Sequence, residues 1–217
     1  MDQNNENSTP AKKQIKVIGF GRRLVATLID GLLVVFGTTI LAFAASILFT
    51  LVSIFDQNDP LPFNTLLVVV GVIFSLFYYV GFWAKSGQTI GKALTSIMVV
   101  GTDGEPISWG RGLARYVGYI ISGLAASIGF LWIEFNSTRQ GWHDKIATTY
   151  VVGENQAFSD ANAVEFVPSD PGKPWIWIVV WIVVAWGAPA ALFSSLWFLG
   201  PIINQMAGNL LWGILGK

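Results

Sequence analysis

The sequence has no cysteine and a single histidine, His143, among its 217 residues. Disulfides, thiolate zinc sites, iron–sulfur clusters, cysteine nucleophiles and bis-histidine haem ligation are therefore excluded within the chain. Charge is also scarce, because 12% of the residues are charged, against roughly 25% in an average soluble domain. The 13 basic and 13 acidic residues balance, so the strongly basic footprint of nucleic-acid-binding proteins is missing and we expect no nucleic-acid partner.

Apolar residues make up 53% of the chain and gather in long runs. The run from Leu24 to Phe55 holds one charge, Asp30, and at about 1.5 Å per residue it exceeds the roughly 30 Å hydrocarbon core of a bilayer. A cleaved signal peptide is the alternative, but its apolar core would be only about 7–15 residues long. After a polar break at 56–60, Asn64–Ala84 supplies a second uncharged run. The two runs predict an antiparallel pair of transmembrane helices.

Basic residues favour one side of this helix pair. The break between the two runs contains Asp56 and Asp59 and no basic residue. Because cytoplasmic loops are enriched in Lys and Arg, we expect a multi-pass plasma-membrane protein with residues 1–17 as a polar, cytoplasmic N-terminus. The basic residues that support this orientation are Lys12, Lys13, Lys16, Arg22 and Arg23 before the first run, and Lys85, Lys92, Arg111 and Arg115 after the second.

Two weaker segments follow the helix pair. Ile97–Val100 and Pro106–Trp109 flank an Asp-Gly turn signal, which predicts a short cytoplasmic β-hairpin. Tyr116–Phe135 is apolar but interrupted by glycines, with basic residues on both sides. A re-entrant helical hairpin keeps both ends in the cytoplasm, provided that neighbouring protein or water satisfies the backbone at its tip. We favour this arrangement, and a complete fourth span is the alternative.

The C-terminal part divides into a linker and a tryptophan-rich segment. Residues 153–173 are polar and rich in Pro, Ser and Asn, so we expect a linker. Trp175–Leu199 predicts a third span, kinked at Gly187 and Pro189, and Pro201–Lys217 an interfacial helix, so that 174–217 is a C-terminal membrane segment. Its tryptophans are candidate docking or packing residues: Trp175, Trp177, Trp181 and Trp186.

These segments together predict an all-α integral membrane protein. It would have three transmembrane helices, a re-entrant or fourth membrane helical segment at 116–135, and one small cytoplasmic β-hairpin. The membrane domain would lie between the polar N-terminus and the linker, at residues 18–152.

The charge inside the first span is the main candidate for function. Arg23 precedes Asp30 by seven residues, about two helical turns, so both lie on one face with Asp30 about 10 Å deeper. An acid at that depth pairs with a cation, is protonated or faces water, and it is by default a candidate functional site. The alternative, given equal weight, is a structural ion pair that locks the helices together, with Lys92, Arg111 or Arg139 as partner.

Two other motifs are weaker candidates for a functional site. The segment Gly87–Lys92 resembles a phosphate loop, but only three residues separate Gly87 from Gly91, and Ala93 replaces the required Ser or Thr. His143 beside Asp144 has too few potential ligands nearby for a metal site, and a charged stop after the re-entrant hairpin is the simpler interpretation. We expect no metal, no cofactor and no enzymatic activity.

Three ordered blocks complete the pattern: Arg23–Asp30, then Ser86–Lys92 with Val99–Gly104, then Arg139–Asp144. Their order and spacing resemble the RDD family of small membrane proteins. The family takes its name from an arginine and two aspartates, which match Arg23, Asp30 and Asp144 here. The resemblance implies that these three charges form a unit. Supporting positions within the blocks are Arg139, His143, Lys92, Gly87 and Gly91.

Two functions remain open at this stage. The family resemblance implies ion or solute transport, including cation/proton exchange, in which Asp30 would carry the ion. The favoured interpretation is an accessory or structural subunit of a larger membrane complex or oligomer, because so few spans do not enclose a solute path alone. The expected partners are the lipid bilayer and other membrane subunits or further copies of the chain.

Overall fold

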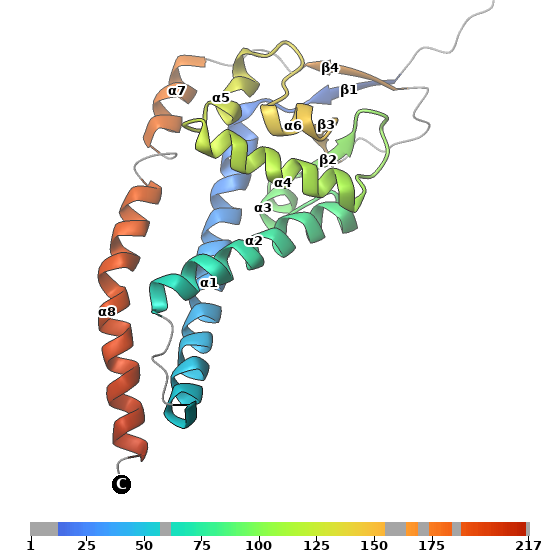
Figure 1. The fold of residues 1–217 in the computed structure, drawn as a ribbon. Coiled ribbons are helices and arrows are strands. Elements are labelled where there is room, and N and C mark those ends of the chain that lie inside the picture. Colours follow the sequence, from blue (N-terminus) through green and yellow to red (C-terminus); the bar gives the residue numbers. More distant parts are fainter. Residues whose placement is uncertain (1–12, 57–61, 155–163, 169–173, 184–187, 216–217) are drawn as a thin grey trace, which may run out of the picture.

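A computed structural model describes residues 13–56, 62–154, 164–168, 174–183 and 188–215. The chain is mostly helical, with one small sheet (Figure 1). Its helices are α1 (Phe20–Asp56), α2 (Phe63–Ser86), α3 (Ile90–Leu94), α4 (Trp109–Leu124), α5 (Ile128–Phe135), α6 (Trp142–Ile146), α7 (Pro174–Ile182) and α8 (Ala188–Leu215). Its strands are β1 (Lys13–Val17), β2 (Ile97–Gly101), β3 (Thr149–Gly153) and β4 (Val164–Pro168).

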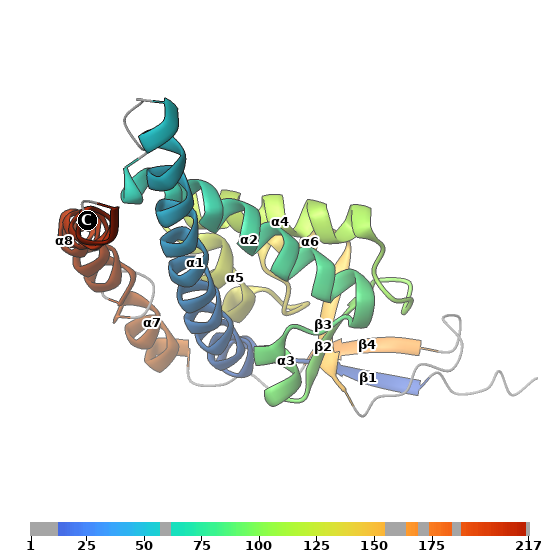
Figure 2. The ribbon, with the colours of Figure 1, turned by 90° about the horizontal axis from the view of Figure 1, so that it is seen from below.

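The apolar runs Leu24–Phe55 and Asn64–Ala84 lie in α1 and α2, and both helices are long and apolar enough to cross a membrane. Small residues set their crossing. The ring of Phe74 lies against Gly37, and the methyl group of Thr38 lies over Gly71, so the two backbones approach closely. In Figure 2 the two helices diverge from the end where the chain turns between them. Most of the apolar surface of both helices is left uncovered by the chain itself.

Helices α4 and α5 form a bent pair. Their axes differ by 100° across a break of a few residues, as in a broken span or a re-entrant loop. Ala126 and Ser127 adopt positive φ at the bend. Counting this pair as one span would give the described residues three candidate spans. The bend agrees with the segment predicted at 116–135 and leaves both alternatives for it in place.

The sheet corrects the predicted β-hairpin. The turn after β2 forms as expected, with the Gly101 amide donating to Glu105 O at 2.8 Å. The chain then enters α4 instead of a second strand, because Pro106 lacks an amide donor and Ser108 caps the helix by accepting from Arg111 N. Strand β2 pairs antiparallel with β3 instead, in the sheet order β2-β3-β1-β4. The fold is therefore not all-α.

Segments on both sides of the predicted membrane domain, residues 18–152, also enter this sheet. Residues 13–17, predicted as part of a polar N-terminus, form β1. Val164–Pro168, predicted as part of a linker, forms β4 and pairs parallel with β1. Four of the five residues of β4 are apolar, and the ring of Phe166 stacks on Tyr150 with centroids 4.5 Å apart. The segment 153–173 is therefore not a linker throughout.

The described residues of the C-terminal segment form α7 and α8, and the predicted kink at Gly187 lies outside them. Helix α8 continues through Pro201 to Leu215, so the predicted separate interfacial helix from Pro201 is wrong. Polar residues Asn204, Gln205 and Asn209 lower its hydropathy, and neither α7 nor α8 is among the candidate spans found in the described residues. Helix α8 packs against α1 and α2 (Figure 1).

Candidate functional site

Asp144 on α6 is the centre of a buried charge cluster. Its Oδ2 accepts hydrogen bonds from Arg23 Nη1 at 2.7 Å and from the Gly141 amide at 2.9 Å. Its Oδ1 accepts from Arg115 Nη1 on α4. Asp144 is 0% exposed and the two arginines are 6% and 1% exposed. The cluster ties α1, α4 and α6 together at one carboxylate.

Both arginines also satisfy backbone and side-chain acceptors. Arg23 donates to Arg139 O and to Ile18 O, each at 2.9 Å. Arg115 donates to the hydroxyl of Thr149, the first residue of β3. The cluster therefore joins α1 and α4 to the small sheet.

The surrounding positive charges keep Asp144 in its ionised form. Burial alone would raise the pKa of this carboxyl, but the positive charges of Arg115 and Arg23 and the Gly141 amide lower the pKa below its usual value. Neighbouring His143 behaves differently: burial, with the charges of Arg115 and Arg23, lowers its pKa to about 3 despite the opposing effect of Asp144. His143 is thus neutral at physiological pH, packed against the rings of Tyr119 and Phe130 at centroid distances of 4.5 and 5.0 Å.

Asp30 forms the second buried cluster, on α1. Its Oδ1 accepts from Tyr78 Oη at 2.8 Å and from the Gly91 amide at 2.7 Å, and its Oδ2 accepts from Thr89 Oγ1 at 2.6 Å. Lys92 Nζ lies 4.0 Å from Oδ2. Asp30 is 0% exposed and Lys92 is 3% exposed. The carboxylate therefore links α1 to α2 and α3.

Glycines make this second cluster possible. Gly87 ends α2 with φ 70°, a left-handed conformation that suits glycine, and its amide donates to Trp83 O at 2.9 Å. A Cβ atom at Gly91 would collide with the carbonyl oxygen of Ala26 and lie 2.8 Å from Asp30 Oδ1. Gly87 thus serves the turn from α2 into α3, whereas Gly91 lets α3 approach the backbone of α1 closely.

The three charges Arg23, Asp30 and Asp144 do not meet at one point. Arg23 pairs with Asp144, whereas Asp30 pairs with Lys92. The ring of Trp83 lies between the two clusters, 5.5 Å from Lys92 Nζ and 5.2 Å from Arg115 Cζ, measured to its centroid. The expected unit is therefore two ion pairs joined through one indole ring.

Arg139, one of the three cations considered for Asp30, forms a pair of its own. Its Nη1 lies 3.3 Å from Glu134 Oε2 and donates to Glu134 O at 2.9 Å. Arg111, also considered, pairs at the surface with Asp103 at 2.6 Å. Of the three proposed partners, only Lys92 lies beside Asp30.

Four residues of the site were not predicted from the sequence as site residues: Tyr78, Trp83, Thr89 and Arg115. Tyr78 and Trp83 lie in an apolar run where aromatic residues are common, and Arg115 served only as evidence for orientation. A polar donor inside a span is the signal that could have identified Tyr78. The side chains of Trp175, Trp177, Trp181 and Trp186, predicted to dock or pack, lie outside the described part of the structure. Within the described residues there is no group of three or more His, Asp or Glu able to hold a metal ion.

Comparison with known proteins fits this arrangement. The model of the RDD family matches residues 17–148, which contain both clusters. The chain belongs to the RDD family. Strand β4 and helices α7 and α8 follow the matched region.

Curated relatives include an uncharacterized protein, YxaI, of Bacillus subtilis, which is 32% identical over 148 residues, 63% of this chain and 97% of the relative. A proline-rich antigen homolog of Mycobacterium tuberculosis is 33% identical over 88 residues, 40% of this chain and 37% of that protein. An uncharacterized protein of Rickettsia prowazekii, RP437, is 26% identical over 96 residues, 44% of this chain and 53% of that protein. No solved structure matches the chain.

Neutral His143 predicts a specific loss of stability in mild acid. Between about pH 6.5 and 3 the unfolded chain binds a proton at this residue and the folded chain does not, so stability rises with pH in that window. At about 1.4 kcal/mol per pH unit, the free energy of unfolding should fall by about 2.5 kcal/mol between pH 7 and 4.5. Thermal unfolding of the detergent-solubilised chain at stepped pH measures this loss.

The matched variant is His143→Gln, because His143 is the only histidine in the chain. Its stability should be nearly flat between pH 7 and 4.5. The stability that depends on charged Asp144 is lost only at lower pH, since its folded pKa lies below the value of a free carboxyl. A wild-type slope retained in His143→Gln would contradict the assignment.

Proposed function

We propose that the chain is a structural membrane protein, an accessory subunit of a larger membrane complex or a subunit of an oligomer. The observation that carries this proposal is the saturation of Asp30. Each carboxylate oxygen already accepts a hydrogen bond, and the residue is 0% exposed. An ion-carrying carboxylate needs an acceptor that is free to exchange its partner. A carboxylate held by three donors and a lysine is suited to fixing helices in place.

The second cluster supports the same role. Asp144, Arg23 and Arg115 are buried together and also bond the backbone and β3. Such buried charge pairs are weak sources of net stability, but removal of one partner is strongly unfavourable. They therefore specify one arrangement of the helices and the sheet. We propose that this rigid arrangement presents the outer apolar faces of α1 and α2 to lipid and to neighbouring subunits.

We place the protein in the plasma membrane with the sheet and the N-terminus in the cytoplasm. The support is the distribution of charge: basic residues Lys16, Arg22 and Lys85 lie near the sheet end of α1 and α2, while Asp56 lies at the opposite end of α1. In this proposal the chain uses no cofactor and performs no catalysis.

Cation/proton exchange is the second candidate, and one distance favours it. Lys92 Nζ stands 4.0 Å from Asp30 Oδ2, longer than a direct hydrogen bond. An acid and a base so placed inside the helical part of the chain could exchange a proton. The transport proposal needs Asp30 to release its other donors in each cycle.

The composition of the intact particle tests the proposal. The full chain is extracted gently from its native membrane and weighed by native mass spectrometry. The structural proposal expects a stoichiometric foreign subunit or a defined oligomer. A particle of a single chain, with no partner at any mild detergent concentration, would overturn it and favour transport by the monomer.

A further inference from the structure

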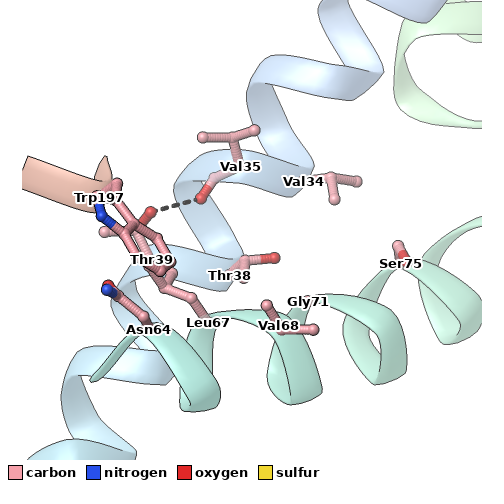
Figure 3. A pocket seen from close by; sticks show the side chains of 10 residues that line it. All are labelled: Val34, Val35, Thr38, Thr39, Asn64, Leu67, Val68, Gly71, Ser75 and Trp197. Atoms are coloured by element: carbon pink, nitrogen blue, oxygen red, sulfur yellow. Dashed lines mark hydrogen bonds between the residues drawn. The ribbon is translucent and has the colours of Figure 1, made fainter. Parts of the chain in front are cut away.

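A cavity of about 310 Å³ lies between α1, α2 and α8 (Figure 3). Its wall is mainly apolar, formed by Val34, Val35, Leu67 and Val68, with Trp197 of α8 at one side. No charged side chain lines it. Residues 34–39 lie about 20–30 Å along α1 from Phe20. The cavity therefore lies near the middle of the first candidate span.

Two polar atoms at this cavity have no hydrogen-bond partner. Thr38 is 8% exposed, and neither its Oγ1 nor the buried Oδ1 of Asn64 is paired among the described residues. In Figure 3 the side chain of Thr38 points from α1 toward α2, and Asn64 lies on α2 near Trp197. Unpaired polar atoms in an apolar medium are unfavourable. Both atoms can accept a hydrogen bond, so a bound molecule with a donor group would satisfy them.

The other hydroxyl groups of the cavity are already engaged. Thr39 donates to Val35 O at 2.8 Å, and Ser75 is paired with Tyr116 Oη at 2.7 Å. Among the described residues that line the cavity, the unpaired oxygen atoms are thus those of Thr38 and Asn64. This contrast separates an unfilled site from the ordinary local bonding of hydroxyls in apolar helices.

We propose that this cavity binds a neutral aliphatic molecule that carries a hydroxyl group. The apolar wall contacts the hydrocarbon part of this molecule, and the hydroxyl donates to Thr38 Oγ1. The lack of charge on the wall disfavours a phosphate headgroup. A volume near 300 Å³ holds a segment of such a molecule and not a whole phospholipid. The cavity lies mostly on α1 and α2, inside the family match, and Trp197 from the region that follows the match completes its wall.

Photolabelling tests the proposal with the full chain in phospholipid vesicles. The probes are a diazirine analogue of 1-octanol and a diazirine analogue of octane, which lacks the hydroxyl. We expect the alcohol to label the peptides of α1 and α2 that contain Val34, Val35 and Val68, in competition with unlabelled octanol. The loss of one hydrogen bond lowers affinity by about fivefold, so the octane probe should label these peptides correspondingly less.

Matched variants make the test specific. Thr38→Val removes the unpaired hydroxyl with little change in shape and should lower labelling by the alcohol about fivefold. Thr39→Val removes a hydroxyl that already bonds its own helix and should leave labelling unchanged. Thermal unfolding of both variants checks that they fold. Equal labelling by the two probes, or equal labelling of the two variants, would overturn the proposal.

The natural source is found by mass analysis of molecules that co-purify with the wild-type chain. A neutral glycerolipid with a free hydroxyl and a polyprenol or fatty alcohol share the proposed chemistry, and either one supports the proposal. Its enrichment should fall about fivefold in Thr38→Val and stay unchanged in Thr39→Val. Equal enrichment in both variants would contradict a site at Thr38.

Discussion

Substitution of Asp144 by Asn should lower the free energy of unfolding by about 3–5 kcal/mol, because breaking a buried charge pair leaves an uncompensated charge. Here two cations, Arg23 and Arg115, would remain almost fully buried beside a neutral amide. Asn keeps the size of the side chain and one acceptor oxygen, so the loss of stability would come mainly from the missing carboxylate charge. Thermal and denaturant unfolding of the full chain in one detergent measures it.

Asp103→Asn provides the matched control. Asp103 forms an equally short pair with Arg111, at 2.6 Å. Both side chains are more than one third exposed, Asp103 at 41% and Arg111 at 34%. Exposed pairs contribute roughly 0–1 kcal/mol, so this variant should unfold almost like the wild type. Similar losses in the two variants would contradict a special role for the Asp144 cluster.

Asp30→Asn should also destabilise the fold strongly, by about 3 kcal/mol, and for a reason that a second substitution can test. An Asn oxygen can still accept from Tyr78 and from the Gly91 amide, and the hydroxyl of Thr89 can turn to accept from the new amide. What the variant loses is the negative charge beside Lys92, which is 3% exposed. The unpaired ammonium group then carries most of the expected loss.

Lys92→Met in the Asp30→Asn background should therefore restore stability. Replacing a buried ion pair by neutral residues of similar size is often close to neutral, so the double variant should unfold within about 1.5 kcal/mol of the wild type. The four free energies of unfolding give the coupling between the two residues. A double variant less stable than Asp30→Asn alone would show that Lys92 does not serve to neutralise Asp30.

The sequence predicted the elements whose signal is local. The apolar runs located α1 and α2, because the length of an uncharged segment decides whether it can span a bilayer. The glycines and flanking charges of 116–135 set this segment apart from the long spans, and the structure has a 100° bend there, which fits a re-entrant loop or a broken span. The order of the three motif blocks identified the family, which the match over residues 17–148 confirms.

The sequence did not predict the features that depend on distant partners. Arg115 and Asp144 are 29 residues apart and Arg23 and Asp144 are 121 apart, and nothing local indicates which cation takes which carboxylate. The same holds for the pairing of β2 with β3 and for β4, whose apolar residues lie in a polar stretch. Local turn chemistry at Asp103 and Gly104 was correct, but the strand partner came from elsewhere in the chain.

Ion flux through vesicles that contain the wild type or the Asp30→Asn/Lys92→Met double variant tests the structural role most directly. Proton and cation fluxes are measured with equal amounts of folded protein, beside protein-free vesicles. The structural account predicts that all three preparations give the same flux. A flux carried by the wild type and lost in the folded double variant would contradict it and assign Asp30 to transport.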